Sequence, residues 1–243
     1  MSEAMIGSSQ PRTVDAGRGV GWWADGWALF MMNPGMWVAL GFVLLLICLL
    51  LAFVPFLGSL ATSLLMPVFI GSWMLAARKV EAGGALEVND LFTCFKDKLS
   101  PLLVLGALLL AAALVIGLVI GMLGFGAVMG MMAGGSHHSA GGMMAAFGAG
   151  MLALLIGLVL GFIVAMAIWF APALVVFRDM APVDALKASI DASLKNVVPF
   201  LVYGLIYIVA SIVASIPFGL GWLVLVPVLL LTAYVSYKDV FGA

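Results

Sequence analysis

Methionine and histidine residues gather in one glycine-rich stretch, and together they suggest copper chemistry. The stretch covers residues 124–150 and separates two apolar runs. Thioether sulfur is a soft ligand that suits Cu(I), and imidazole accepts copper in either oxidation state. The candidate metal ligands are Met129, Met131, Met132, His137, His138, Met143 and Met144. Their spacing forms no compact ligand pattern, and Met is also a common flexible apolar residue. Copper is therefore the one cofactor considered, and copper handling ranks third among the functions that the sequence supports.

A polar stripe and three prolines within apolar segments form a second candidate site. The residues are Tyr203, Tyr207, Ser211, Ser215, Pro67, Pro172 and Pro227. The four hydroxyl-bearing residues recur every four positions, so a helix would place them on one face. A proline inside a helix leaves backbone carbonyl groups without their usual partners. These features predict a groove for a small or lipid-like solute, although such hydroxyl groups also commonly bond to neighbouring helices.

Groups for catalysis or ion coupling are missing from the apolar segments. The sequence contains no HExxH, P-loop or CxxC motif, and its only two histidines are adjacent in the glycine-rich stretch. An ionisable side chain inside a membrane span costs about 2.5–3.5 kcal/mol or more, so it usually marks a function. We therefore expect no enzymatic activity and no proton coupling. A passive transporter or channel remains the alternative function.

The composition determines the class of protein to which these candidate sites belong. Of the 243 residues, 65% are hydrophobic and only 9% are charged, whereas about a quarter are charged in soluble domains. The blocks 26–77, 99–177 and 196–237 contain no charged residue. Each is long enough for two crossings, since a helix needs roughly 20 apolar residues to span the membrane. The sequence thus predicts an all-α integral membrane protein with six transmembrane helices. They are expected at about 35–54, 59–77, 101–123, 151–177, 199–215 and 220–237.

Three amphipathic helices are expected between these spans, lying at the membrane surface. The first two cover 18–32 and 88–95, and the third lies within the stretch 178–196. The apolar residues expected at the interface are Trp23, Trp27, Phe30, Val88, Leu91, Phe92, Phe95, Leu186 and Ile190. They recur at helical spacing, and tryptophan favours the boundary between membrane and water. These helices are the expected contacts with lipid or with a partner protein.

The order of the segments suggests a threefold internal repeat. Each unit consists of an amphipathic helix, a break with proline, a span, a turn and a second span that ends in Arg78, Arg178 or Lys238. The units cover about 18–78, 86–178 and 181–238, and the glycine-rich stretch is an insertion in the middle unit. The expected domain organisation is a flexible tail over 1–17 and a single membrane domain over 18–243.

The positive charges predict how the protein is oriented. All ten lysines and arginines lie near the termini or in the second and fourth connections between spans. By the positive-inside rule, both termini and all three amphipathic helices should be cytoplasmic. The net charge of −1 indicates no nucleic-acid partner. The leading hypothesis is a non-enzymatic protein that acts through its cytoplasmic amphipathic helices on lipid or on a partner protein. The oligomeric state stays open.

Two sequence stretches carry a resemblance to a known family. They are GWWADGWALFMMNPGMW at 21–37 and APALVVFRDMAPVDALKASIDASLKNVVPFLVYGL at 171–205. They resemble an uncharacterised family of proteobacterial multi-pass inner-membrane proteins, distantly similar to the membrane domain of some glycerophosphodiester phosphodiesterases. The resemblance implies a bacterial inner-membrane location and supports the fold. The catalytic phosphodiesterase domain has no counterpart here, so that activity does not carry over, and the Met/His insertion departs from the family pattern.

Overall fold

The structure, a computed structural model, describes residues 10–133 and 140–242, and helices are the regular secondary structure that these residues form. The elements are α1 (Arg18–Met32), α2 (Pro34–Ala52), α3 (Leu57–Glu81), η1 (Val88–Phe92), α4 (Cys94–Asp97), α5 (Leu99–Ala133), α6 (Ala140–Arg178), α7 (Pro182–Lys195), α8 (Val197–Ser215) and α9 (Trp222–Phe241). In these residues six helices, α2, α3, α5, α6, α8 and α9, are long and apolar enough to cross a membrane. The all-α class and the six candidate spans are confirmed.

The described residues of the glycine-rich stretch are helical and extend the two helices on either side, whereas the expected spans ended at 123 and began at 151. Within 124–150, α5 continues to Ala133 and α6 begins at Ala140. Glycine weakens a helix in water, but it is frequent in membrane helices, and alanine and methionine favour helix formation. At 35 and 39 residues, these helices are about 52 and 58 Å long at 1.5 Å per residue. Both exceed the ~30 Å hydrocarbon core of a bilayer.

The second expected amphipathic helix is broken into two short elements. Instead of one helix over 88–95, the chain first forms η1. The N-terminus of η1 is capped, because the Asp90 carboxylate accepts the Glu87 N–H at 2.8 Å. The short helix α4 then begins at Cys94, whose N–H donates to the buried Ser72 hydroxyl at 3.0 Å. The apolar spacing was compatible with a continuous helix, but these side-chain bonds to the backbone stabilise two separate turns.

The chain divides into two compact units where one membrane domain was expected. The second unit, Leu108–Ala165, contains α5 from Leu108 onward and α6 up to Ala165. Within it, Gly157 lies so close to Ile120 that an added Cβ would be 2.9 Å from the Ile120 Cδ1. Leu114 and Leu158 are more than 60% exposed. Such a surface is typical of helices that contact lipid.

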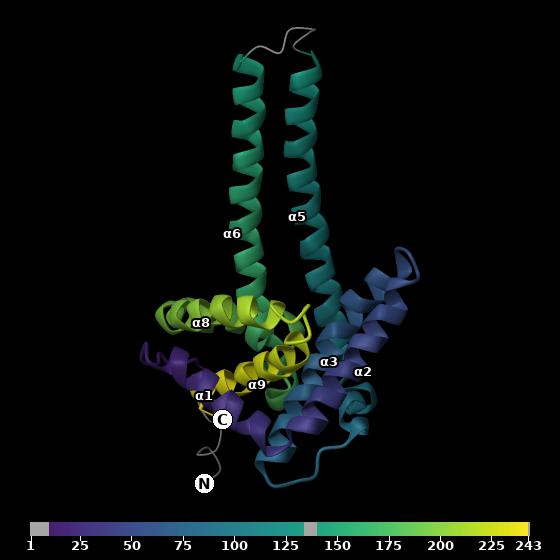
Figure 1. Cartoon of the computed structure of the whole chain (residues 1–243), viewed down its shortest axis with the longest axis vertical. Helices are drawn as coiled ribbons and strands as arrows, with labels where there is room; N and C mark the ends of the chain where they lie inside the picture. The colour runs from purple at the N-terminus through teal and green to yellow at the C-terminus, as the bar shows by residue number, and fades with distance from the viewer. Residues whose placement is uncertain (1–9, 134–139, 243) are drawn as a thin grey trace. The chain divides into compact units, whose positions relative to one another are not determined.

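The first unit, up to Ala107 and from Met166 onward, is built around α3 and α9. About half of the apolar window of each helix is buried, against at most 17% for each of the other four candidate spans. The N-terminal helix α1 packs against α9 and α8 (Figure 1). The approach is close because Gly26 faces Thr232, where an added Cβ would be 2.6 Å from the Thr232 methyl group. Helix α1 is therefore part of the core of this unit.

Part of the expected flexible tail is anchored to the first unit. The Arg12 N–H donates to the Val240 carbonyl oxygen at 2.8 Å. The Val14 N–H donates to Asn196 Oδ1 at 2.8 Å, and Asn196 is fully buried. The side-chain nitrogen of Asn196 in turn donates to the Arg12 carbonyl oxygen. The prediction of a free tail over 1–17 is thus wrong for residues 12–14, because a buried amide requires these partners.

Helix α7 packs on α6 through a serine that bonds to the α6 backbone. Ser189 is fully buried. Its hydroxyl accepts the Phe170 N–H at 3.0 Å and donates to the Met166 carbonyl oxygen at 2.6 Å. A regular helix would pair these two backbone groups with each other. The small-residue face of α7, which also includes Ala185 and Ala192, is therefore the face that packs inward.

We predict that Ser189→Ala lowers the free energy of unfolding by about 1–3 kcal/mol, because two buried backbone groups lose their partner. Ser193→Ala is the matched control. The Ser193 hydroxyl contacts the same Met166 oxygen, but at 3.4 Å, which is a longer and weaker hydrogen bond. Titration with sodium dodecyl sulfate, followed by circular dichroism, measures both variants. Equal losses for the two would show that Ser189 has no special role in the α6 backbone.

Candidate functional site

The polar residues of α9 hold its C-terminal half to three other helices. The Tyr203 hydroxyl of α8 lies 2.8 Å from the Thr232 hydroxyl. The Tyr234 hydroxyl donates to Glu81 of α3 at 2.7 Å. The indole of Trp169 in α6 donates to the Ser236 hydroxyl at 3.0 Å. These three hydroxyl groups thus find their partners on three different helices.

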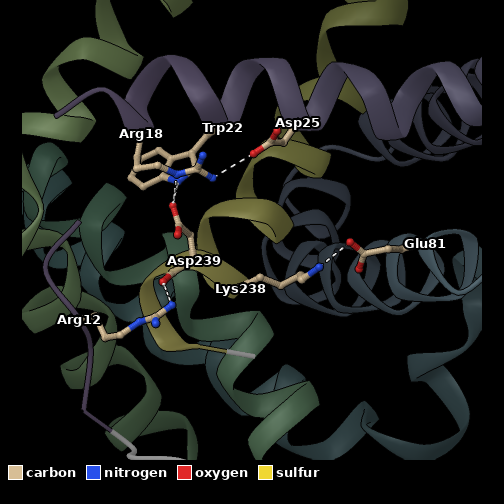
Figure 2. A network of polar contacts seen from close by, with 7 residues as sticks. All are labelled: Arg12, Arg18, Trp22, Asp25, Glu81, Lys238 and Asp239. Carbon is tan, nitrogen blue, oxygen red and sulfur yellow. Dashed lines mark hydrogen bonds and ion pairs between the residues drawn. The ribbon is translucent and has the colours of Figure 1, made fainter. Parts of the chain in front are cut away.

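Asp239 gathers the N-terminal part of the chain around the end of α9 (Figure 2). One oxygen of its carboxylate accepts from Arg18 Nε at 2.5 Å and from the Trp22 indole at 2.9 Å. A second nitrogen of Arg18 bonds to Asp25 at 2.9 Å. The Arg12 guanidinium donates to the main-chain oxygen of Asp239 at 2.6 Å. The hydrogen bond to Asp239 raises the pKa of Arg18, so this guanidinium stays charged.

A groove of about 620 Å³ lies beside this network, between α1 and the end of α9, and we call it the α1–α9 groove. It is lined by Arg12, Arg18, Asp25, Ala28, Leu29, Met32, Glu81, Val235, Lys238 and Asp239. Its lining contains three cations and three carboxylates. Figure 2 shows that Lys238 and Asp239, although adjacent in sequence, point to different partners, Lys238 toward Glu81. The positive and negative charges of this groove are therefore balanced.

A second cavity of about 450 Å³, the three-helix pocket, lies where α3, α6 and α9 end. It is lined by Arg78, Glu81, Phe177, Arg178, Tyr234, Tyr237 and Lys238. Its lining contains three cations and one carboxylate. The cations are those that end the second span of each predicted unit, so the structure brings these three residues together. Glu81 and Lys238 line both cavities and form the ion pair between them.

The hydroxyl stripe of α8 does not line the predicted groove. Tyr203 is only 5% exposed, and its hydroxyl bonds to Thr232, so the prediction is wrong for this residue. The Ser211 and Ser215 hydroxyls each donate at 2.8 Å to a carbonyl oxygen of their own helix. Tyr207 is half-buried on the same helix. These hydroxyls, apart from that of Tyr207, serve packing and local bonding.

The three span prolines are buried where helices pack. Pro227 contacts α2 at Gly41, where an added Cβ would be 3.1 Å from the proline ring. Pro67 and Pro227 each lie eleven residues before the cation that ends their helix, whereas Pro172 lies six residues before it. Pro172 therefore occupies a different place in its helix from the other two. Neither of the two cavities above includes any of the three.

The residues expected at the membrane interface divide into three groups. Phe30 and Leu91 are buried, Trp27, Val88 and Phe92 are exposed, and Trp23, Phe95, Leu186 and Ile190 are half-buried. The prediction is wrong for Phe30 and Leu91, because α1 and η1 each turn one apolar face into the protein. Trp23 stacks on Tyr203, with ring centroids 5.0 Å apart.

The copper ligands predicted from the sequence fall mostly outside the part of the chain that the structure describes. This holds for His137 and His138, and for the side chains of Met131, Met132 and Met143. Met129 in α5 and Met144 in α6 are described, and both are exposed. Among residues 10–133 and 140–242, no three His, Cys, Asp or Glu side chains form a group that could hold a metal ion.

Sequence reasoning missed the acidic partners and one tryptophan of the charged network. Asp25, Glu81 and Asp239 were counted as charges, and Trp22 was not assigned to the aromatic face of α1. Trp22 is fully buried, whereas the neighbouring Trp27 is about half exposed. A signal was present, because Asp25 is the one carboxylate of α1 and Asp239 the one carboxylate of α9, and both helices are largely apolar. An isolated carboxylate in such a place requires a cation nearby.

We predict that Asp239→Asn lowers the free energy of unfolding by about 1–3 kcal/mol, because the part-buried Arg18 and Trp22 groups lose a charged acceptor. Asp191→Asn is the control, since its pair with Lys195 is an exposed contact one helical turn away and should contribute under ~0.5 kcal/mol. Denaturation in mild detergent measures both. A loss no larger for Asp239→Asn than for the control would contradict the central role of this carboxylate.

Comparison with known proteins places the chain in a family. Residues 24–240 match the family described as a domain of unknown function, DUF7847. A probable inner membrane protein of Burkholderia thailandensis is 30% identical over 212 residues, which cover 86% of this chain and 78% of that protein. No solved structure matches the chain. The match spans nearly the whole sequence and agrees with the six apolar helices, so this multi-pass membrane protein belongs to the DUF7847 family.

Proposed function

We propose that the protein is a non-enzymatic inner-membrane protein whose amphipathic segments α1, η1 and α7 contact lipid at the cytoplasmic surface. The observation that carries the proposal is a stripe of exposed apolar side chains on α1. Val20, Trp27 and Met31 are 53%, 49% and 54% exposed. Spacings of seven and four residues place them on one helical face. The other side of α1 carries Arg18 and the groups that face the α1–α9 groove.

The other two segments expose apolar side chains in a similar way. Val88 and Phe92 are exposed in η1, and Val183 and Leu194 are exposed in α7. Helix α7 turns its small residues inward and leaves these larger ones at the surface. Apolar area left in water is unfavourable by about 25 cal/mol per Å². The exposed apolar side chains of these three segments therefore favour an apolar environment around them.

Lipid is favoured over a partner protein as that surrounding. Helix α1 packs against α8, and α8 is itself a candidate span with exposed residues such as Leu201 and Leu205. The stripe on α1 therefore adjoins a helix whose exposed side chains suit the hydrocarbon core. A tryptophan such as Trp27 is typical of the boundary between hydrocarbon and water. An amphipathic helix at this boundary buries its apolar face among the lipid chains.

Spin labels on adjacent residues of α1 test this proposal. In a Cys48→Ala, Cys94→Ala background, a label at Trp27→Cys should be relaxed mainly by oxygen, which concentrates in lipid. A label at Ala28→Cys, which lines the α1–α9 groove, should be relaxed mainly by water-soluble nickel chelate. Equal nickel accessibility at both positions would contradict lipid contact. A label at 27 that neither reagent reaches would point to a covering protein instead.

The proposed orientation places both termini and α7 in the cytoplasm. It is supported by the distribution of the ten cations. We predict that Phe218→Cys, fully exposed between α8 and α9, reacts with a membrane-impermeant maleimide in spheroplasts. Lys187→Cys, exposed on α7, should react only after lysis. The reverse pattern would overturn the orientation.

We further propose that the protein consists of three repeated units. The buried positions of α3 and α9 support this, because they recur at the same distance from the cation at each helix end. Pro67 and Ser72 in α3 correspond to Pro227 and Thr232 in α9, and all four are buried. In an experimental structure, residues 18–78 and 181–238 should superpose with Arg78 on Lys238. A different helix arrangement in the two segments would contradict the repeat.

A further inference from the structure

We propose that the three-helix pocket binds a phosphate group, carried either by a lipid headgroup or by a small soluble ligand. This goes beyond the lipid contact of the amphipathic segments, and it does not depend on that contact. The pocket differs from the α1–α9 groove in its charge. Three cations face one carboxylate in the pocket, whereas three face three in the groove. An anion would therefore be attracted to the pocket and not to the groove.

Arg78 is the cation that is most available to a ligand. It is exposed, and within the described part of the chain no carboxylate lies within ion-pair distance of it. Its guanidinium carbon lies 4.7 Å from the centroid of the Phe177 ring. This contact holds the planar group by one face and leaves its N–H edge for an acceptor. Guanidinium donors match the paired oxygens of a phosphate group.

The other two cations are held in place by their surroundings. Arg178 donates to the Phe241 carbonyl oxygen at 2.6 Å, and its guanidinium lies 5.3 Å from the Phe241 ring centroid. The Lys238 nitrogen pairs with Glu81 and lies 5.7 Å from the Tyr234 ring centroid. Side chains fixed in this way lose little conformational freedom when a ligand binds. They therefore supply fixed N–H donors beside Arg78.

The position and size of the pocket suit a phosphate group. Three helices end there, and helix C-termini carry partial negative charge that the cations must first offset. Arg78, which forms no ion pair with any described carboxylate, supplies the positive charge that a ligand would meet. A cavity of about 450 Å³ lies within the usual range for small-molecule sites. Because α3, α6 and α9 are candidate spans, their ends lie where lipid headgroups would be.

The test compares the full-length protein with Arg78→Gln in two arms. In the first arm, inorganic phosphate is titrated onto protein in nanodiscs of phosphatidylcholine alone, with calorimetry as the readout. In the second arm, native mass spectrometry counts the phosphatidylglycerol molecules retained after extraction from a mixed phosphatidylcholine–phosphatidylglycerol bilayer. Lys187→Gln is the matched control, since it removes one exposed cation of α7 outside the pocket. Thermal unfolding checks that all proteins are folded.

The proposal expects Arg78→Gln to weaken binding about tenfold in at least one arm, the loss of one charge-assisted hydrogen bond. Arg78→Lys should fall between this variant and the natural protein, because it keeps the charge and loses the paired donors. Loss in the first arm identifies a soluble phosphate ligand, and loss only in the second identifies a lipid headgroup. The proposal is overturned if Arg78→Gln binds as the natural protein does in both arms, or if Lys187→Gln weakens binding equally.

Discussion

The last turns of α9 carry polar side chains into a bundle that is otherwise apolar, and each of those groups needs a partner. Thr232, Tyr234, Ser236 and Asp239 find theirs on α8, α3, α6 and α1 in turn. A polar group left without a partner in such surroundings costs several kcal/mol. The requirement to satisfy four groups at once therefore restricts how the neighbouring helices can be placed. The N-terminal segment of residues 12–14 is bound there for a related reason, because Arg12 donates to backbone carbonyl oxygens at the end of this helix.

The same requirement produces a charged face with two distinct cavities. The pair between Lys238 and Glu81 lies between them and contributes to both. On the side of α1, carboxylates match the cations, and the contacts serve to hold helices together. At the ends of α3, α6 and α9, cations exceed carboxylates, and aromatic rings support them. Adjacent parts of one face thus differ in the charges that line them, which are evenly matched in the groove and mostly positive in the pocket.

Periodicity and charge distribution were sufficient to predict the helical class and the six candidate spans. They did not by themselves predict which helices form the core. The signal lay in composition, because the two most buried helices, α3 and α9, are the least apolar of the six candidate spans. The inward face of α7 was missed for a related reason. Its packing uses Ser189 and other small residues, whereas apolar spacing pointed to its larger side chains. Tyr203 was placed in a groove because hydroxyl spacing does not reveal a buried partner such as Thr232.

The central claim is that the polar end of α9 anchors the first unit, and hydrogen exchange of its backbone amides tests this directly. A terminal helix near the end of a chain normally frays, so its last turns exchange quickly. If the contacts described above hold this end, then peptides covering residues 232–241 in lipid nanodiscs should exchange as slowly as the buried middle of α3. Exchange at these residues as fast as in the exposed α8–α9 connection would contradict the account.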